Sequence, residues 1–156
     1  MSTKGFAIAV AAVAATGFGL MAQTPKPAVA AAPVVVYKTA TCGCCGNWVA
    51  HLRQHGFQVE VHDVAQARLD TVATDAGLTD ELRSCHTAKV GGYTVEGHVP
   101  AADVQKMLKE RPKITGIAVP GMPMGSPGME QGGVKQPYDT VAFTKGGATT
   151  VYARHR

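Results

Sequence analysis

Apolar and polar residues follow two different periods along the chain, and the two periods predict strands and helices in alternation. The β-branched apolar run Val34 to Tyr37 is typical of a buried strand. Residues 57–62 alternate strictly between apolar and polar, which predicts a half-buried strand at a sheet edge. Residues 88–96 predict a hairpin, because two strand-like runs flank the glycine pair Gly91-Gly92.

Helical spacing of apolar residues appears between and after these strands. Helices are expected over 47–55, where Gly56 supplies the C-cap, over 65–75, and from Pro100 onward. The predicted order is therefore β-α-β-α-β-β-α, an α/β fold. Two parallel strands joined by a right-handed crossover, then a hairpin and a covering helix, are the layout of a thioredoxin-like domain.

The character of the chain changes in a C-terminal extension, residues 112–156. Residues 116–133 are rich in Gly, Pro and Met, which predicts a loop. Two further strand-like runs, 140–143 and 149–152, are separated by a glycine pair and predict a second hairpin. This hairpin would extend the sheet or pack over the cysteines. The predicted domain, extension included, spans residues 34–156.

The N-terminus has the layout of a secretory signal peptide, predicted over residues 1–22. One lysine precedes an uncharged apolar stretch, and small residues offer cleavage after Ala22 or Ala30. An Ala/Pro-rich spacer follows and ends at residue 33. The sequence therefore predicts a periplasmic protein with no stable membrane insertion after cleavage. In that oxidising compartment, free thiols persist only if they are bound, cycled or buried.

The charge is modest and scattered. The formal net charge is +4, and lysines and arginines form no run. A solvated surface is the expected role of such charges, so the sequence does not favour a nucleic-acid partner.

All four cysteines fall into two short segments, with Cys42, Cys44 and Cys45 in one and Cys85 in the other. Two structural disulfides are one reading, but adjacent Cys44 and Cys45 would bond only with strain. A thiol–disulfide oxidoreductase is a second reading, because Cys42 and Cys45 have C-x-x-C spacing before a helix, which lowers a thiolate pKa. A shared metal site is the third reading. In the predicted fold Cys85, just before the third strand, faces the other three.

If the cysteines share a metal site, their donor atoms favour copper. Thiolates and thioethers are soft donors that select Cu(I), and several bridged ions suit three near-contiguous thiolates better than one tetrahedral zinc. Residues 121–129 add Met122, Met124 and Met129, which lie among Gly and Pro residues and are not expected to form ordinary core. Zinc does not use thioethers, so zinc is the less favoured metal.

The histidines are less informative. His86, next to Cys85, is a possible ligand or a partner of one. His98 is expected to cap the helix that follows it. His51 and His55 are expected on a solvated helix face, and His155 in a tail.

Four segments of the chain resemble the CopG-like family of exported proteins found with bacterial copper-resistance systems. The matching segments include the C-x-C-C motif and the S-C-H-T motif, and they are 37–48, 84–93, 96–100 and 118–123. The resemblance covers nearly the whole chain from Val34 onward. The family was long described only as a domain of unknown function.

The resemblance implies a thioredoxin-like fold that holds a multinuclear copper–thiolate centre on Cys42, Cys44, Cys45 and Cys85. It also suggests interconversion of Cu(I) and Cu(II) in the periplasm, with copper ions and other periplasmic copper-handling proteins as partners. The prediction is therefore a periplasmic copper-binding protein of copper resistance. The alternative is a thiol–disulfide oxidoreductase of thioredoxin-like fold. Whether the protein is an enzyme stays open; if it is one, it is a copper- or thiol-linked oxidoreductase.

Overall fold

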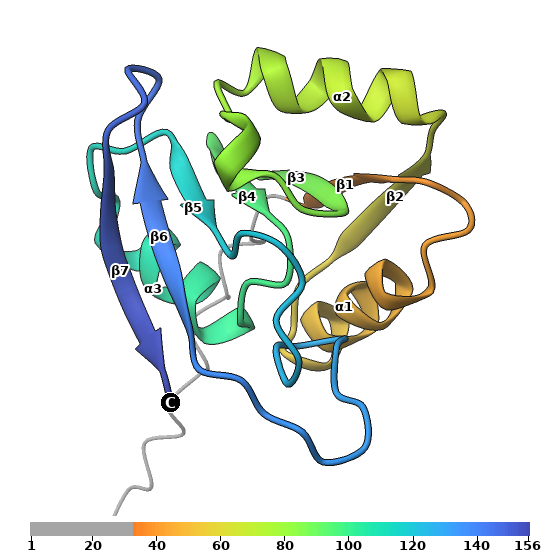
Figure 1. Ribbon diagram of the computed structural model, residues 1–156. Coiled ribbons are helices and arrows are strands. Elements are labelled where there is room, and N and C mark those ends of the chain that lie inside the picture. The colour runs from red at the N-terminus through yellow and green to blue at the C-terminus, as the bar shows by residue number, and fades with distance from the viewer. Residues whose placement is uncertain (1–32) are drawn as a thin grey trace, which may run out of the picture.

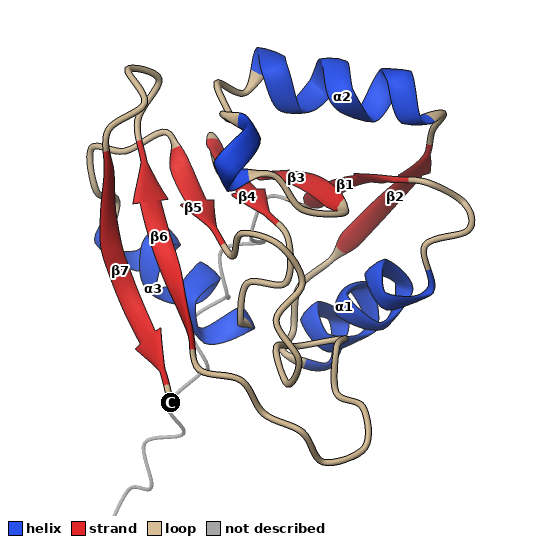
Figure 2. Cartoon of the chain, in the orientation of Figure 1, coloured by secondary structure: helices blue, strands red, loops and turns tan. Residues whose placement is uncertain are grey.

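One seven-stranded mixed sheet organises residues 33–156, with three α-helices packed around it (Figures 1 and 2). The structure, a computed structural model, describes residues 33–156. The signal peptide predicted over 1–22, its cleavage sites and the spacer up to residue 32 lie outside the described residues. In chain order the elements are β1 (Val34–Lys38), α1 (Gly43–Gln54), β2 (Val59–Asp63), α2 (Gln66–Asp75), a 3-10 turn η1 (Asp80–Leu82), β3 (His86–Val90), β4 (Tyr93–Glu96), α3 (Ala101–Glu110), β5 (Gly116–Ala118), β6 (Tyr138–Phe143) and β7 (Thr149–His155).

The predicted mixed α/β fold is confirmed, and the element order β-α-β-α-β-β-α holds through α3. The strand order is β2-β1-β3-β4-β5-β6-β7. β1 pairs in parallel with β2 and antiparallel with β3, and β2 forms an edge, as its alternating sequence predicts. Gly91 and Gly92 join β3 to β4 with φ of 56° and 90°, a region that the tight hairpin turn requires and that glycine enters without strain. The thioredoxin-like assignment stays a prediction.

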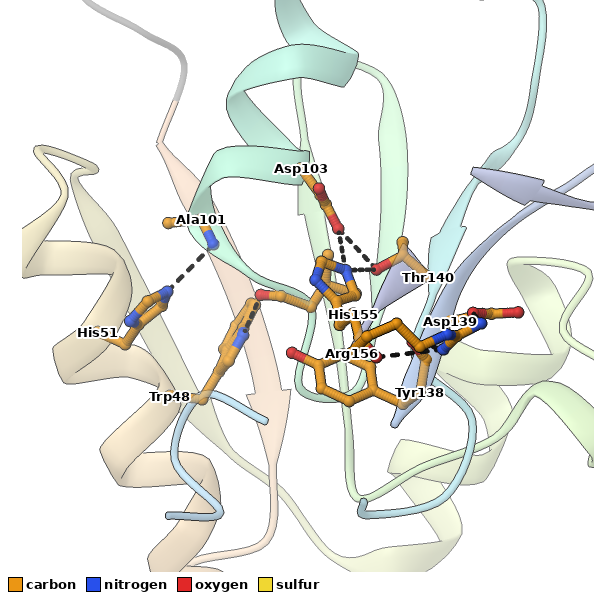
Figure 3. Close-up of polar contacts among 10 residues, drawn as sticks. Trp48, His51, Ala101, Asp103, Tyr138, Asp139, Thr140, His155 and Arg156 are labelled. Atoms are coloured by element: carbon orange, nitrogen blue, oxygen red, sulfur yellow. Dashed lines mark hydrogen bonds and ion pairs between the residues drawn. The ribbon is translucent and has the colours of Figure 1, made fainter. Parts of the chain in front are cut away.

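Two apolar clusters hold the helices to opposite faces of the sheet. α1 and α3 share one face, and α2 lies on the other (Figure 1). Successive side chains of a strand point to opposite faces, so Ile117 joins the α1–α3 cluster and Ala118 joins the α2 cluster. Trp48 of α1 is fully buried, and its indole N–H donates to the Val99 carbonyl oxygen at 2.8 Å (Figure 3).

The C-terminal extension completes the sheet. The predicted second hairpin is confirmed as β6 and β7. It extends the sheet, because β6 pairs with β5, and does not pack over the cysteines. The loop predicted over 116–133 is wrong for its first three residues, which form β5 between β4 and β6. Three residues carry too little periodicity to reveal a strand, and only the two neighbouring strands stabilise it. A Cβ on Gly116 would overlap the Thr94 carbonyl oxygen, so this strand needs glycine there.

A buried polar cluster ties the last strand to α3 (Figure 3). The Thr140 hydroxyl donates to Asp103 Oδ2 at 2.6 Å, and His155 Nε2 lies 3.0 Å from the same oxygen. The expectation that His155 lies in a tail is therefore wrong. Its partners come from α3 and β6, which no local pattern around residue 155 reveals.

None of the helices within residues 33–156 combines the length and the apolar character needed to cross a bilayer.

Candidate metal centre

The four cysteines meet at one end of the sheet. Cys42 precedes α1, while Cys44 and Cys45 lie in its first turn, and Cys85 immediately precedes β3. Because β1 and β3 are antiparallel neighbours with Lys38 opposite His86, the end of β1 and the start of β3 coincide. All four sulfur atoms lie within 4.8 Å of one another. The fold thus brings Cys85 to the other three across 40 residues of sequence.

Two of these cysteines are joined to each other. Cys42 and Cys45 form a disulfide, whereas Cys44 and Cys85 are free thiols. Cys44 Sγ lies 3.6 Å from Cys42 Sγ, and Cys45 Sγ lies 3.5 Å from the Cys85 carbonyl oxygen. The pair with C-x-x-C spacing is therefore the bonded one, and the reading of two structural disulfides does not hold for these four cysteines.

Helix α1 begins earlier than predicted, at Gly43 in place of residue 47. Gly43 and Gly46 are poor helix formers, so local propensity hides the start. Tertiary packing supplies the reason, because Trp48, Val49 and Leu52 are buried along one face of the helix. The consequence is chemical: two cysteines lie in the first turn, where unpaired N–H groups and the helix dipole favour negative charge, and that turn holds no acidic residue.

Two histidines contact the free Cys85 thiol. His98 Nε2 lies 3.1 Å from Cys85 Sγ, and His86 Nδ1 lies 3.4 Å from it. His98 Nδ1 lies 2.8 Å from the Pro127 carbonyl oxygen, which can only accept, so Nδ1 carries the hydrogen and Nε2 presents its lone pair to the sulfur. His86 is fully buried between Trp48 and His98, and its Nε2 has no hydrogen-bond partner.

The expectation that His98 caps the following helix is wrong. The Ala101 amide of α3 donates instead to His51 Nε2 at 3.1 Å, so His51 does not lie on a wholly solvated face (Figure 3). His98 turns toward Cys85, a position that the residues around it in the sequence do not predict. Its presence in segment 96–100, which carries part of the family resemblance, was the one signal that pointed to it.

Burial controls the protonation of these groups. Burial, followed by the nearby Cys44, raises the pKa of the Cys85 thiol to about 12. Burial and the neighbouring His98 lower the pKa of His86 to about 3, and burial also lowers the pKa of His98. At neutral pH the site therefore presents neutral imidazoles and a protonated Cys85 thiol, and a metal ion binding to that sulfur displaces the proton.

The loop between β5 and β6 lies against the cysteines. It has no helix or strand between residues 119 and 137 and passes beside α1 (Figure 1). Gly128, at φ +88°, packs so closely on the first turn of α1 that a Cβ there would lie 2.8 Å from the Cys44 carbonyl oxygen. A side chain at this position would therefore push the loop away from the site.

The three methionines of this loop differ in exposure. Met122 is 52% exposed, Met124 is half-buried, and Met129 is only 9% exposed. The expectation that none of them is ordinary core is therefore wrong for Met129, whose burial comes from the fold of the loop and not from a periodic sequence.

A buried carboxyl group supports the segment that carries Cys85. Glu96 Oε1 accepts from the Ser84 amide at 2.8 Å, and Oε2 accepts from the Thr87 hydroxyl at 2.7 Å. Ser84 Oγ also donates to the Gly121 carbonyl oxygen, which links this segment to the methionine loop. Burial raises the pKa of Glu96 to about 7.

Comparisons with known proteins find one matching family and similar solved structures. Residues 82–129 match a family described as a protein of unknown function, DUF411. The matched segment contains Cys85, His86, His98 and the part of the loop that carries Met122, Met124 and Met129. No curated protein matches the sequence. Two solved structures, described as copper resistance protein copG, Form 1 and Form 2, are each 42% identical, with a TM-score of 0.74, over 80% of this chain and 98% of theirs.

Proposed function

This chain belongs to the CopG-like family, and we propose that it is a periplasmic copper-binding protein of bacterial copper resistance. The proposed site is a multinuclear Cu(I)–thiolate centre on Cys42, Cys44, Cys45 and Cys85. The observation that carries the proposal is the convergence of four sulfur atoms within 4.8 Å. Soft thiolates select Cu(I), and a thiolate that bridges two ions relieves the repulsion between neighbouring negative sulfurs.

The disulfide sets a condition on this proposal. Two electrons and two protons must convert the Cys42–Cys45 disulfide into two thiols before all four sulfurs can bind copper. Loading of the full site therefore requires an external thiol reductant that supplies these two electrons. Interconversion of Cu(I) and Cu(II), which the family resemblance implies, is the redox activity that we propose for the loaded site.

Neighbouring residues are proposed in supporting roles. His86 contacts Cys85 directly, and Met122, Met124 and Met129 belong to the loop that packs on α1. We infer that these side chains add ligands or orient the thiolates. The proposed partners are copper ions and other periplasmic copper-handling proteins, with zinc the less favoured metal.

A thiol–disulfide oxidoreductase is the second candidate, and the disulfide itself favours it. Cys42 and Cys45 have C-x-x-C spacing at the start of α1, with the free Cys85 thiol within reach of both. An enzyme of this kind reduces a protein disulfide or oxidises a protein dithiol, and its own cysteine pair takes up or gives the two electrons without metal. The metal content of protein purified anaerobically from copper-supplemented periplasm separates the two candidates.

Fully reduced protein is expected to bind more than one Cu(I) per chain. Three near-contiguous thiolates and Cys85 offer bridging positions for several soft ions. Anaerobic titration with Cu(I), followed by elemental analysis, measures the stoichiometry. The matched control is the same protein with the Cys42–Cys45 disulfide closed, which should bind fewer ions. Saturation by one tightly held zinc ion, with copper excluded, would contradict the proposal.

Replacing Met122, Met124 and Met129 by leucine is expected to slow copper loading without unfolding the protein. Leucine nearly conserves volume and apolarity, so the cost in stability should stay below about 1.5 kcal/mol per residue. Thioethers bind without deprotonation, so their contribution should be largest at acidic pH, where protons compete for thiolates. Stopped-flow Cu(I) loading measures the rate, and tolerance to copper in a dependent strain gives a second readout. Met107→Leu, in the buried face of α3, is the control. Unchanged loading in the triple variant would show that these methionines only cover the site with apolar side chains and do not bind copper.

A further inference from the structure

The environment of Cys85 contains a second set of converging ligand atoms. Cys85, His86 and His98 each offer one ligand atom, and these atoms lie within 4.8 Å of one another. This set shares Cys85 with the four-cysteine cluster but otherwise consists of imidazole nitrogens. Neither Cys44 nor the disulfide-bonded pair belongs to it.

We propose that Cys85, His86 and His98 form a mononuclear copper site with one thiolate and two imidazole ligands, available while the Cys42–Cys45 disulfide closes the four-cysteine cluster. The proposal rests on the proposed function in its choice of metal and in its use of Cys85. It goes beyond that function by assigning His98 as a ligand and by giving the oxidised protein a metal site of its own.

The distances suit one small ion. With metal–sulfur bonds of about 2.3 Å and metal–nitrogen bonds of about 2.0 Å, a tetrahedral angle separates sulfur from nitrogen by roughly 3.5 Å. The two observed separations from Cys85 Sγ are 3.1 Å to His98 Nε2 and 3.4 Å to His86 Nδ1. Small outward shifts of the side chains are enough to admit the ion.

His98 is already oriented as a ligand. Its Nδ1–H donates to the Pro127 carbonyl oxygen at 2.8 Å, which selects the tautomer with a lone pair on Nε2. Metal-binding histidines usually donate their other N–H to a carbonyl or carboxylate in this way. The same hydrogen bond joins the ligand to the methionine loop, so the loop positions it.

His86 is a second, independent observation in favour of a ligand. The residue is fully buried, its Nε2 has no hydrogen-bond partner, and Cys85 Sγ is the polar neighbour of its Nδ1. Apart from this sulfur, no hydrogen-bond partner among residues 33–156 occupies Nδ1. With its hydrogen on Nε2, the imidazole presents the Nδ1 lone pair toward Cys85, where a metal ion can bind.

The donor set favours copper. Imidazole nitrogens suit copper and zinc, and one thiolate with two imidazoles is the donor set of trigonal copper sites that hold both Cu(I) and Cu(II). A metal ion binds the neutral form of an imidazole and the deprotonated form of a thiol, so Cys85 must lose its proton when the ion binds.

The test uses Cys44→Ser protein with the Cys42–Cys45 disulfide intact, so that Cys85 is the single free thiol. Anaerobic addition of Cu(II) should give one bound equivalent, an intense visible thiolate-to-Cu(II) charge-transfer band, and imidazole scattering in X-ray absorption. His98→Gln should weaken binding at least tenfold and change the band. His62→Gln, at an exposed position of β2, is the matched control and should change neither.

Several outcomes would overturn the site. The first is Cu(II) binding that persists in Cys85→Ser, and the second is an unchanged affinity and spectrum in His98→Gln. The others are X-ray absorption that shows sulfur and no imidazole around copper, and immediate loss of the charge-transfer band as Cu(II) oxidises the thiol. If the buried His86→Gln variant does not fold by circular dichroism, His98→Gln decides alone. Cu(I) titration of the fully reduced wild type, run in parallel, reports on the four-cysteine cluster, so failure of either site is recognised separately.

Discussion

Cys85→Ser is expected to damage Cu(I) binding about as much as Cys44→Ser does, although Cys85 lies 40 residues from Cys45. Its sulfur lies within 4.8 Å of the other three, so it is expected to bridge ions that the C-x-C-C segment holds. A serine hydroxyl is a hard, weakly acidic donor that does not replace a soft thiolate. We expect the stoichiometry to fall and the affinity for the remaining Cu(I) to drop at least tenfold, or about 1.4 kcal/mol.

The measurement is competition with a Cu(I) chelator in fully reduced protein, with Cys44→Ser as the comparison within the cluster. Thr150→Ser, at an exposed position of β7, is the control for a substitution to serine far from the cysteines and should leave Cu(I) binding unchanged. Full stoichiometry and affinity in Cys85→Ser would show that copper binds to the C-x-C-C segment without the β3 end of the sheet.

The free energy of unfolding is expected to depend on pH through Glu96. Burial raises its folded-state pKa to about 7, against a reference value of 4.5. Between these values the folded protein keeps a proton that the unfolded chain has lost, so stability falls as pH rises through this window. The difference of about 2.5 pKa units corresponds to about 3 kcal/mol, present at the acidic end and lost above about pH 7.

Glu96→Gln should remove this dependence. The amide stays neutral, its oxygen can still accept from the Ser84 amide, and Thr87 Oγ1 can accept from its nitrogen. Denaturant unfolding of metal-free protein with the disulfide intact, between about pH 5 and pH 8, measures the difference between variant and wild type. Glu110→Gln, an exposed carboxylate at the end of α3, is the control. Parallel stability profiles for Glu96→Gln and wild type would contradict the role of Glu96.

Much of the fold could be predicted because local patterns encode it. The apolar run of β1, the alternation of β2 and the glycine pair between β3 and β4 each reflect a requirement of the element itself. The same reasoning placed Cys85 opposite the C-x-C-C segment, because strand order determines which chain ends coincide.

The features that the sequence does not predict depend on contacts between distant segments. β5 is three residues long, and its pairing with β4 and β6 defines it. Helix α1 starts among glycines, since burial of Trp48 and Leu52 outweighs the local propensity. His155 and Met129 take their surroundings from segments far away in the sequence.

The sequence by itself determined the donor types and the family: soft sulfur atoms in a C-x-C-C segment, one distant cysteine, and an α/β domain to carry them. Tertiary structure decided which pair forms the disulfide, and it turned His98 away from α3 and toward Cys85. The physical reason is that composition and periodicity record what each segment can bind or form. Hydrogen bonds such as that from His98 to Pro127, 29 residues away, depend on how the packed segments meet.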